Sequence, residues 1–250
     1  MKAAQSIHIG TSGWHYDHWQ GVFYQRKLPK KDFLAHYKDR FKTVEINNTF
    51  YQLPNCRTLK QWHDTVPADF IFSVKASRYI THMKKLKDGA ESTAKFFDAV
   101  KVLGKKLGPI LFQLPPHWKV NIDRLEDFLR QLPEKYQYTF EFRDTSWFTT
   151  DVYKLLAEHH AAFCIYDIDR RMSPKRITAD FIYIRLHGPA GAYEGSYDRK
   201  TLEIWAEDFE IWSKQGREIY CYFDNDQAAY ATKNALSLQK IIDTTDTDLH

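Results

Sequence analysis

Apolar and polar residues alternate along several short segments of this chain. Between residues 138 and 143, Phe140 and Phe142 share one parity, whereas Glu141 and Arg143 share the other. Successive side chains of a strand point to opposite faces, so one face of this segment is apolar and the other carries two opposite charges. The same kind of alternation predicts eight strands, near residues 7–11, 42–47, 70–75, 109–114, 137–143, 162–167, 181–187 and 218–224.

Between the predicted strands, apolar residues recur at every third or fourth position, which predicts helices that bury one face. The four clearest stripes are Phe97, Val100, Gly104 and Leu107; Ile122, Leu125, Phe128, Leu129 and Leu132; Leu202, Trp205, Phe209 and Trp212; and Ala228, Ala231, Ala235 and Leu238. Right-handed crossovers through such helices return each strand in the same direction, which gives a parallel sheet. We therefore expect an α/β protein with a single-domain (β/α)8 barrel of the TIM type over residues 1–243, followed by a polar C-terminal tail at residues 244–250.

A doubly wound open sheet is the main alternative to a barrel. That fold usually carries a glycine-rich phosphate turn after its first strand. Here Gly10-Thr-Ser-Gly13 is followed by Trp14, so the dinucleotide-binding fingerprint is absent, and the chain has no P-loop pattern either. The sequence favours the barrel.

Polar residues of the second parity occur late in the predicted strands. In a barrel, the apolar parity packs outward on the helices and the other parity points toward the axis, with functional sites at the carboxyl ends of the strands. Only the sixth strand departs from the rule, because Asp167 shares the parity of its apolar residues. We expect one pocket to gather Glu45, Asn47, Lys75, Gln113, Glu141, Arg143, Arg185, His187 and Asp224.

The same residues could instead form ion pairs that fill the barrel end without any other role. Glu141 with Arg185, or Glu45 with Lys75, would serve that purpose. Burying so many charges costs several kcal/mol each unless they are paired. Chance placement is therefore disfavoured. A functional pocket and a set of ion pairs that only fills the barrel end remain the two interpretations.

Aromatic residues make up 16% of the chain, and several fall in predicted loops after strands. Flat rings beside cations suit a nucleobase with its phosphate, and they suit a phosphorylated sugar equally well. Packing of the loops over the barrel end is the alternative role. The candidate ligand-binding aromatics are Trp14, Tyr51, Trp147, Tyr193 and Tyr197, with Trp19 and Phe50 near them.

Charge and cysteine content narrow the classes of protein only slightly. The formal net charge of +4 is compatible with an anionic ligand but does not require one. The three cysteines, Cys56, Cys164 and Cys221, follow no disulfide or metal spacing, which favours the reducing cytoplasm. No stretch approaches the ~20 apolar residues of a membrane span, so we expect no membrane partner.

Motifs spread over residues 7–225 resemble those of one family, the YecE-like proteins, catalogued as domain of unknown function seventy-two. They are Gly10-Thr-Ser-Gly-Trp14 with Tyr16, Trp19 and Gly21-Val-Phe-Tyr24; Val44-Glu-Ile-Asn-Asn-Thr-Phe-Tyr51; Phe72-Ser-Val-Lys75 with Ile80-Thr-His82; Gln113-Leu-Pro-Pro116; Glu141-Phe-Arg143 with Ser146-Trp147; Arg185-Leu-His-Gly188 with Tyr193 and Tyr197; and Tyr222-Phe-Asp-Asn225. The resemblance implies a TIM-type barrel and no established reaction. Two positions differ from the pattern that is common in the family: Asp144 stands where a histidine is frequent, and Asp224 where an asparagine is frequent.

The charged candidates suggest three kinds of chemistry. Glu141 and Glu45 could act as a general acid and base, the arrangement of glycosidases if the carboxyl groups lie ~5–9.5 Å apart. Lys75 could be a nucleophile or proton carrier if neighbouring cations lower its pKa. Glu45, Glu141, His187 and Asp224 could hold a divalent metal, although no clear ligand motif is present and the cofactor stays unknown.

Together these observations predict a hydrolase-like enzyme that acts on a small anionic, phosphate-bearing or nucleotide-like substrate. Glu141 is the first candidate for the acid or base, Glu45 is the second, and Lys75 and His187 assist. The candidate substrate-binding residues are Arg143, Arg185, Asn47, Gln113, Trp14, Tyr51, Trp147, Tyr193, Tyr197, Asp224 and Asn225. A non-catalytic module that binds nucleic acid or a small anion, and a glycosidase-like hydrolase, are the alternatives.

Overall fold

The computed structural model describes residues 7–247, with side chains through residue 244. Its strands are β1 (Ile7–Thr11), β2 (Thr43–Ile46), β3 (Ile71–Lys75), β4 (Leu107–Gln113), β5 (Tyr138–Glu141), β6 (Ala162–Ile168), β7 (Arg171–Met172), β8 (Phe181–Leu186) and β9 (Glu218–Phe223). Its α-helices are α1 (Phe33–Tyr37), α2 (Cys56–Thr65), α3 (Gly89–Val100), α4 (Ile122–Leu129), α5 (Thr150–Glu158), α6 (Arg199–Lys214) and α7 (Tyr230–Thr247). Short 3-10 or π turns η1 to η6 lie at Asp17–Trp19, Lys30–Asp32, Asn48–Phe50, Tyr79–Met83, Lys101–Lys106 and Thr145–Trp147.

All eight predicted strands are present, and β7 is an additional short strand that pairs antiparallel with the end of β6. One helix prediction was wrong in its second half. Helix α3 ends at Val100, Gly104 has a positive φ of 53° that interrupts the following turn, and Leu107 already opens β4. Two other predicted stripes extend past their helices. Leu132 lies beyond the end of α4, and Ala228 lies before the start of α7.

The chain divides into two compact units that interleave along the sequence. Unit 1 contains residues 7–44, 165–173 and 180–247, and unit 2 contains residues 45–164 and 174–179. Strand β2 therefore changes unit after Val44, and β6 changes unit after Cys164. Each unit has its own strands and helices.

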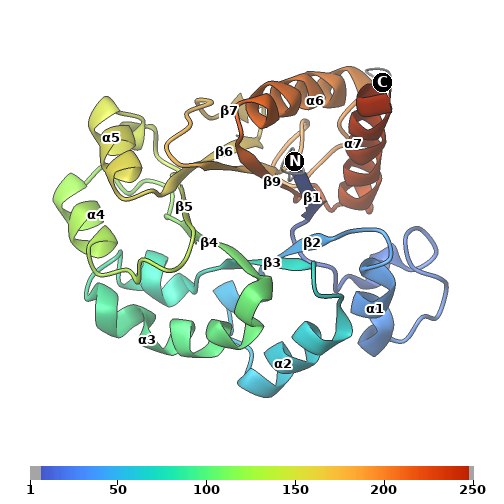
Figure 1. Ribbon diagram of the computed structural model, residues 1–250, viewed down its shortest axis with the longest axis horizontal. Coiled ribbons are helices and arrows are strands. Elements are labelled where there is room, and N and C mark those ends of the chain that lie inside the picture. Colours follow the sequence, from blue (N-terminus) through green and yellow to red (C-terminus); the bar gives the residue numbers. More distant parts are fainter. Residues whose placement is uncertain (1–6, 248–250) are drawn as a thin grey trace. The chain divides into compact units, whose positions relative to one another are not determined.

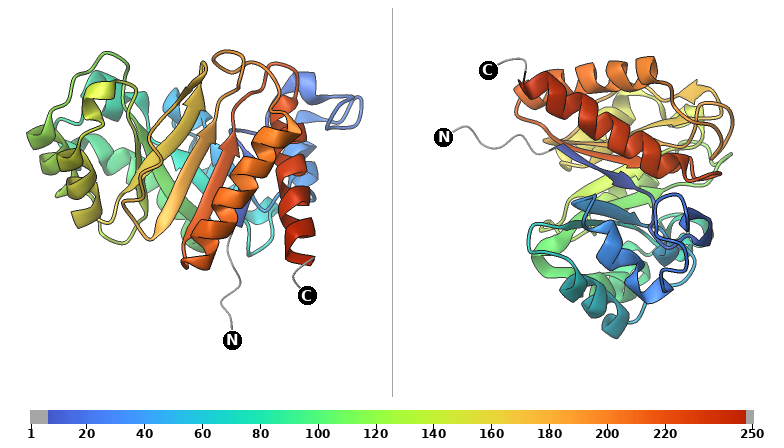
Figure 2. Two further views of the ribbon diagram at one scale, coloured as in Figure 1. Left: turned by 90° about the horizontal axis from the view of Figure 1, so that it is seen from above. Right: turned by 90° about the vertical axis from the view of Figure 1, so that its right-hand side faces the viewer.

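Unit 1 is built on strands in the order β1–β9–β8–β6. Strand β1 pairs in parallel with β9, where Ile7 lies opposite Ile219, and β9 pairs in parallel with β8. Helices α6 and α7 pack against each other and on β9, and α7 also packs on β1 (Figures 1 and 2). The predicted stripe Leu202, Trp205, Phe209 and Trp212 is buried, which confirms this helix.

Unit 2 is built on strands in the order β6–β5–β4–β3–β2. Parallel pairing sets Gln113 of β4 opposite Glu141 of β5. Helix α2 packs on α3, and α3 on α4 (Figure 1). The Phe128 ring of α4 meets the Phe112 ring of β4 edge to face at 5.1 Å. The apolar parity of β4 therefore faces a helix, as its alternation predicts.

Helix α7 is longer than the sequence indicates. It continues through Thr247, so residues 244–247 of the predicted polar tail belong to the helix, and residues 248–250 lie outside the described residues. The Thr244 hydroxyl donates a hydrogen bond to the Lys240 carbonyl one turn earlier, so this polar side chain is accommodated within the helix. No helix within residues 7–247 is both long and apolar enough to cross a membrane.

Candidate functional site

In unit 2, charged and amide side chains stand where adjacent strands end. Lys75 closes β3, Gln113 closes β4 and Glu141 closes β5, with Arg143 two residues further on. The parallel register fixes this order, because Lys75 lies opposite Leu111 and Gln113 lies opposite Glu141. We call Lys75, Gln113, Glu141 and Arg143 the unit 2 cluster.

Glu141 is fully buried, and the Arg143 guanidinium compensates its charge. Arg143 Nε donates to Glu141 Oε1, and Cys164 Sγ lies 3.9 Å from the other carboxylate oxygen. A buried carboxylate needs such a charge-assisted partner, since an unpaired one costs several kcal/mol. The Arg143 side chain itself is 11% exposed, so the pair presents the guanidinium rather than the carboxylate to its surroundings.

Lys75 is held over an aromatic ring. Its Nζ lies 4.3 Å from the centre of the Phe50 ring, a cation–π contact. Thr49, also fully buried, donates its hydroxyl to the Lys75 carbonyl at 2.6 Å and so ties the turn Asn48–Phe50 to the end of β3. The ammonium therefore has a defined position at the strand end.

His82 lies near the cations of this region. Burial lowers the pKa of His82 to about 4, with further lowering by Lys75, Arg78 and Arg143. Its ring also meets the Phe50 ring edge to face at 5.0 Å. Three cations close enough to repel one imidazolium form a positive environment of the kind that binds phosphate or carboxylate groups.

Two amide oxygens of unit 2 are buried without a hydrogen-bond partner among the described residues. They are Asn47 Oδ1, just past β2, and Gln113 Oε1, at the end of β4. Buried polar atoms usually have a partner, so such atoms in a native fold call for a ligand or a water. Glu45, on β2 before Asn47, is fully buried as well.

The aromatic candidates of unit 2 separate into two kinds. Trp147 is fully buried, stacks on Phe142 at 4.8 Å and donates its indole N–H to the Trp118 carbonyl, so it packs a loop rather than offering a free surface. Tyr51 is 76% exposed. Asp144, which the sequence singled out as unusual, caps the turn at Thr145–Trp147 and accepts a hydrogen bond from Ser146 N. The Ser146 side chain and then its N–H lower the pKa of Asp144.

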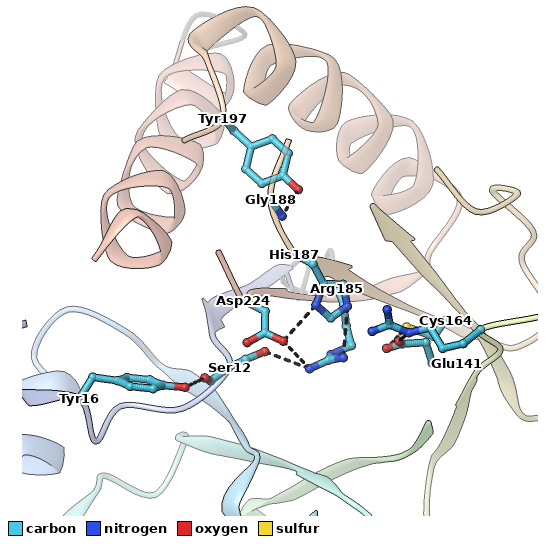
Figure 3. A network of polar contacts seen from close by, with 10 residues as sticks. Ser12, Tyr16, Glu141, Cys164, Arg185, His187, Gly188, Tyr197 and Asp224 are labelled. Carbon is cyan, nitrogen blue, oxygen red and sulfur yellow. Dashed lines mark hydrogen bonds and ion pairs between the residues drawn. The ribbon is translucent and has the colours of Figure 1, made fainter. Parts of the chain in front are cut away.

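In unit 1, Arg185, His187, Asp224 and Ser12 form a second group, the unit 1 cluster (Figure 3). Arg185 is fully buried and donates from Nη2 to Asp224 Oδ2 at 2.9 Å and to Ser12 Oγ at 3.5 Å. Its Nη1 lies 3.2 Å from His187 Nε2, and His187 Nδ1 lies 3.0 Å from Asp224 Oδ2. The carboxylate at position 224 therefore provides the counter-charge that a neutral asparagine would not.

The arginine also fixes the protonation of His187. A guanidinium only donates hydrogen bonds, so Nε2 must accept and the ring proton belongs on Nδ1, facing Asp224. Nε2 faces Arg185 and the ring is fully buried, so His187 is better placed to order the unit 1 cluster than to exchange protons with a substrate.

Asn225 and Tyr197 hold the segment between β8 and α6. Asn225 Nδ2 donates to the Gly195 carbonyl and to Asn234 Oδ1, and the Tyr197 hydroxyl accepts from Gly188 N at 2.9 Å. Asn234 binds both backbone groups of Tyr197. These contacts favour loop packing for Asn225 and Tyr197, as does the 5% exposure of Trp14, whereas Tyr193 is 46% exposed beside His187.

Sequence reasoning missed Asp226, which joins two loops of unit 1. Trp19 Nε1 donates to Asp226 Oδ1 at 2.5 Å, and His18 Nε2 lies 3.0 Å from Oδ2. Burial raises the pKa of Asp226 to about 6, and nearby Asp224 adds to the rise while Trp19 and His18 oppose it. The available signal was the run Asp224-Asn225-Asp226 directly after a predicted strand. Thr49 and His82 were missed as well, because their roles depend on the path of loops.

The predicted site residues thus lie in both units. Glu45, Asn47, Lys75, Gln113, Glu141 and Arg143 belong to unit 2, and Arg185, His187 and Asp224 to unit 1. The ion pairs with the clearest geometry are Glu141–Arg143 and Arg185–Asp224. Within residues 7–247, no three His, Cys, Asp or Glu side chains form a group that could hold a metal ion.

Parallel strands that alternate with helices, with charged side chains at the strand ends, are typical of α/β barrel proteins. Residues 8–249 match the family model described as "Protein of unknown function DUF72", and the chain belongs to this family. A curated relative is UPF0759 protein YunF of Bacillus subtilis, 26% identical, with 95% of each chain covered.

Solved structures agree with this assignment. A DUF72 family protein of Thermotoga maritima is 30% identical and matches 95% of this chain and 99% of its own with a TM-score of 0.86. A DUF72 family protein of Enterococcus faecalis, 18% identical, shares the fold with a TM-score of 0.81, with 95% of each chain covered. The predicted fold class, a single TIM-type α/β barrel domain, is confirmed by the Thermotoga structure.

Proposed function

We propose that this protein is a hydrolase-like enzyme that binds a small phosphate-bearing, nucleotide-like substrate at the carboxyl ends of β3, β4 and β5 in unit 2. The observation that carries the proposal is the placement of Lys75, Gln113 and Arg143 at or just past the ends of neighbouring strands, and Lys75, Arg78 and Arg143 also help burial to lower the pKa of His82. Cations fixed at strand ends can bind a phosphate through charge-assisted hydrogen bonds.

The partnerless amide oxygens of Asn47 and Gln113 support the proposal. Each can accept a hydrogen bond from a hydroxyl or amine of the substrate, and binding would satisfy both buried atoms. A substrate that carries hydroxyl groups beside its phosphate therefore fits this region better than a bare anion.

The Glu141–Arg143 pair suggests how binding and chemistry are connected. Arg143 covers the fully buried carboxylate, and a bound phosphate competes for the guanidinium. As Arg143 turns toward the phosphate, Glu141 becomes a general base that takes a proton from the attacking water. The water oxygen bonds to phosphorus, the ester P–O bond breaks, and the leaving oxygen takes a proton from Glu45 or from solvent.

Phosphate binding can be tested with inorganic phosphate, followed by calorimetry and by NMR of His82. Bound phosphate offsets the three cations and should raise the pKa of His82 from about 4. Lys75→Met and Arg143→Met should each weaken binding about 10- to 100-fold, the usual worth of a charge-assisted bond. The exposed Lys95→Met is the matched control and should bind normally.

Absence of any phosphate effect on His82, together with normal binding in both variants, would refute this site. Turnover is tested by phosphate release from p-nitrophenyl phosphate and from nucleoside monophosphates. Glu141→Gln should abolish release and keep phosphate binding, whereas the exposed Glu134→Gln should change neither. Unchanged turnover in Glu141→Gln and in Glu45→Gln would remove the acid–base assignment.

A further inference from the structure

A cleft of about 500 Å³ lies in unit 2, between the turn that follows β2 and helix α2. Tyr51 and Trp62 are its aromatic residues, and Asn48, Gln52 and Asn55 are its amides. All its lining residues fall within residues 48–62 of unit 2. We call it the Tyr51 cleft.

Tyr51 offers an open aromatic surface in this cleft. At 76% exposure it is the most exposed large hydrophobic side chain among the described residues. Its ring meets Phe50 edge to face at 5.0 Å, which orients the ring. Exposed aromatic surface with a fixed orientation is a usual feature of sites that stack flat ligands.

Hydrogen bonds hold the backbone that carries Tyr51 in a defined turn. Tyr51 N and Gln52 N both donate to the Asn48 carbonyl, at 3.1 and 3.0 Å. Thr49 anchors the same turn to the carbonyls of Ile46 and Lys75. On the far wall, Asn55 caps α2 by accepting from Thr58 N at 2.8 Å, which fixes the start of the helix that bears Trp62. Little entropy is lost when a ligand enters such a site.

A single aromatic ring connects the cleft to the cations. Phe50 contacts Tyr51 on one side and lies under Lys75 Nζ at 4.3 Å on another. A ligand with a flat ring on Tyr51 can therefore place an attached phosphate toward Lys75.

We propose that the Tyr51 cleft binds the nucleobase of a mononucleotide whose phosphate lies on Lys75 and Arg143. This inference rests on the proposed function and specifies its substrate class. The base stacks on Tyr51, and the amides of Asn48 and Gln52 provide donors and acceptors for a base edge, with the Asn55 amide N–H as a further donor. A sugar phosphate without a base would leave the cleft unused.

The test compares the affinities of inorganic phosphate, ribose 5-phosphate and adenosine 5′-monophosphate by calorimetry. For the unmodified protein, the monophosphate should bind about 10-fold or more tightly than ribose 5-phosphate, because a stacked base typically adds that much. Tyr51→Ala should remove this difference and leave inorganic phosphate binding unchanged. Tyr51→Phe keeps the ring and should retain the difference.

The outcomes separate this inference from the function on which it rests. If phosphate and ribose 5-phosphate fail to bind, the proposed function fails first. If both bind and the monophosphate gains nothing, or if Tyr51→Ala keeps the full gain, the nucleobase assignment is wrong while the phosphate site stands. Trp62→Phe, which keeps an aromatic ring on the cleft wall, should reduce the gain only in part.

Discussion

Glu141 and Arg143 lie two residues apart at one strand end, and this spacing puts both side chains on the same side of the backbone. The carboxylate is fully buried and the guanidinium nearly so. A buried ion pair adds little net stability, but removing one partner leaves a buried charge without compensation. Each side chain therefore contributes to stability mainly by compensating the buried charge of the other.

We expect Glu141→Gln to lower the free energy of unfolding by about 3 kcal/mol, because Arg143 would keep a buried charge without its carboxylate. Urea unfolding followed by circular dichroism measures the change. The exposed Glu134→Gln should stay within about 0.5 kcal/mol of the unmodified protein. A loss no larger than that of the control would mean that Arg143 is already solvated.

His82 should make stability depend on pH. Its folded pKa of about 4 is below the ordinary 6.5, so between these values the unfolded chain binds more protons than the folded one. The contribution to stability is complete above pH 6.5 and decreases as the pH falls toward 4. The free energy of unfolding of the unmodified protein should therefore fall relative to that of His82→Gln over this window.

NMR titration of the His82 ring gives an independent check. Lys75→Met should raise the midpoint, since it removes a neighbouring positive charge. A midpoint near 6.5 in the unmodified protein would show that the three cations do not act on this ring. That result would contradict the positive environment that we infer around His82.

At the scale of elements, the loops after β1 and β9 are joined by Asp226. Its pKa of about 6 is above the ordinary 3.8, so the folded state binds the extra proton between these values. The associated stability is present below pH 3.8 and is lost as the pH rises through 6. Asp226→Asn keeps an acceptor for Trp19, and we expect it to be more stable than the unmodified protein above pH 6 and not below pH 4.

Thermal unfolding at both pH values measures the difference. A variant that is less stable at neutral pH would show that the contact with His18 outweighs the burial of the carboxylate. Asp127→Asn, at an exposed position of α4, is the control and should change stability by a similar amount at both pH values.

The loop after β8 depends on Gly188. Its φ is +120°, and a Cβ there would lie 2.3 Å from the Glu194 carbonyl oxygen. Alanine can adopt neither the backbone conformation nor the space, so the segment that carries Tyr193 and Tyr197 must move. We expect Gly188→Ala to cost at least about 2 kcal/mol of unfolding free energy, while Gly216→Ala, which also has a positive φ but open space, should cost less.

Strands could be predicted from the sequence more reliably than the connections between them. Alternation fixed β5, and Pro115-Pro116 marked the end of β4, because both features are local. Helix α3 was extended too far since Leu107 continues the helical spacing, and only the conformation of Gly104 separates helix from strand. The short β7 has too few residues for any periodicity.

Candidate site residues on strands could likewise be predicted more reliably than those on loops. Glu141, Arg143 and Lys75 were found because strand parity places them at strand ends; Glu141 is fully buried and the Arg143 side chain is 11% exposed. Parity says nothing of loops, so Thr49 and His82 were missed. An aromatic ring in a loop can pack or bind equally well, and only the structure separates the buried Trp147 from the exposed Tyr51.

For the whole molecule, the three cysteines give a simple test of the packing. Cys164 and Cys221 are buried and Cys56 is exposed, and each is a free thiol. Burial also raises the pKa of Cys221, which makes its thiolate scarce. A thiol reagent such as Ellman's should rapidly modify Cys56 in the folded protein and all three cysteines in urea. Rapid modification of all three in the folded protein would show that Cys164 and Cys221 are not buried.

Salt dependence separates a small ligand from a polymeric one. With a net charge of only +4, we expect binding of a mononucleotide to weaken modestly with salt, whereas a protein that neutralises many nucleic-acid phosphates loses affinity by orders of magnitude. Titration of the monophosphate and of a single-stranded oligonucleotide at two salt concentrations measures both slopes. Tight oligonucleotide binding with a steep slope would favour the nucleic-acid module instead.

The pairing of β1 with β9 has a consequence for biosynthesis. Ile7 is synthesised 212 residues before its partner Ile219 (219 − 7). Until β9 emerges, the nascent chain carries a strand edge that has no mate, which is a recognised route to misassociation. Such distant pairing raises contact order and slows folding. A chaperone that shields the emerging β1 edge would therefore be expected to improve the yield of folded protein more than one that acts after release.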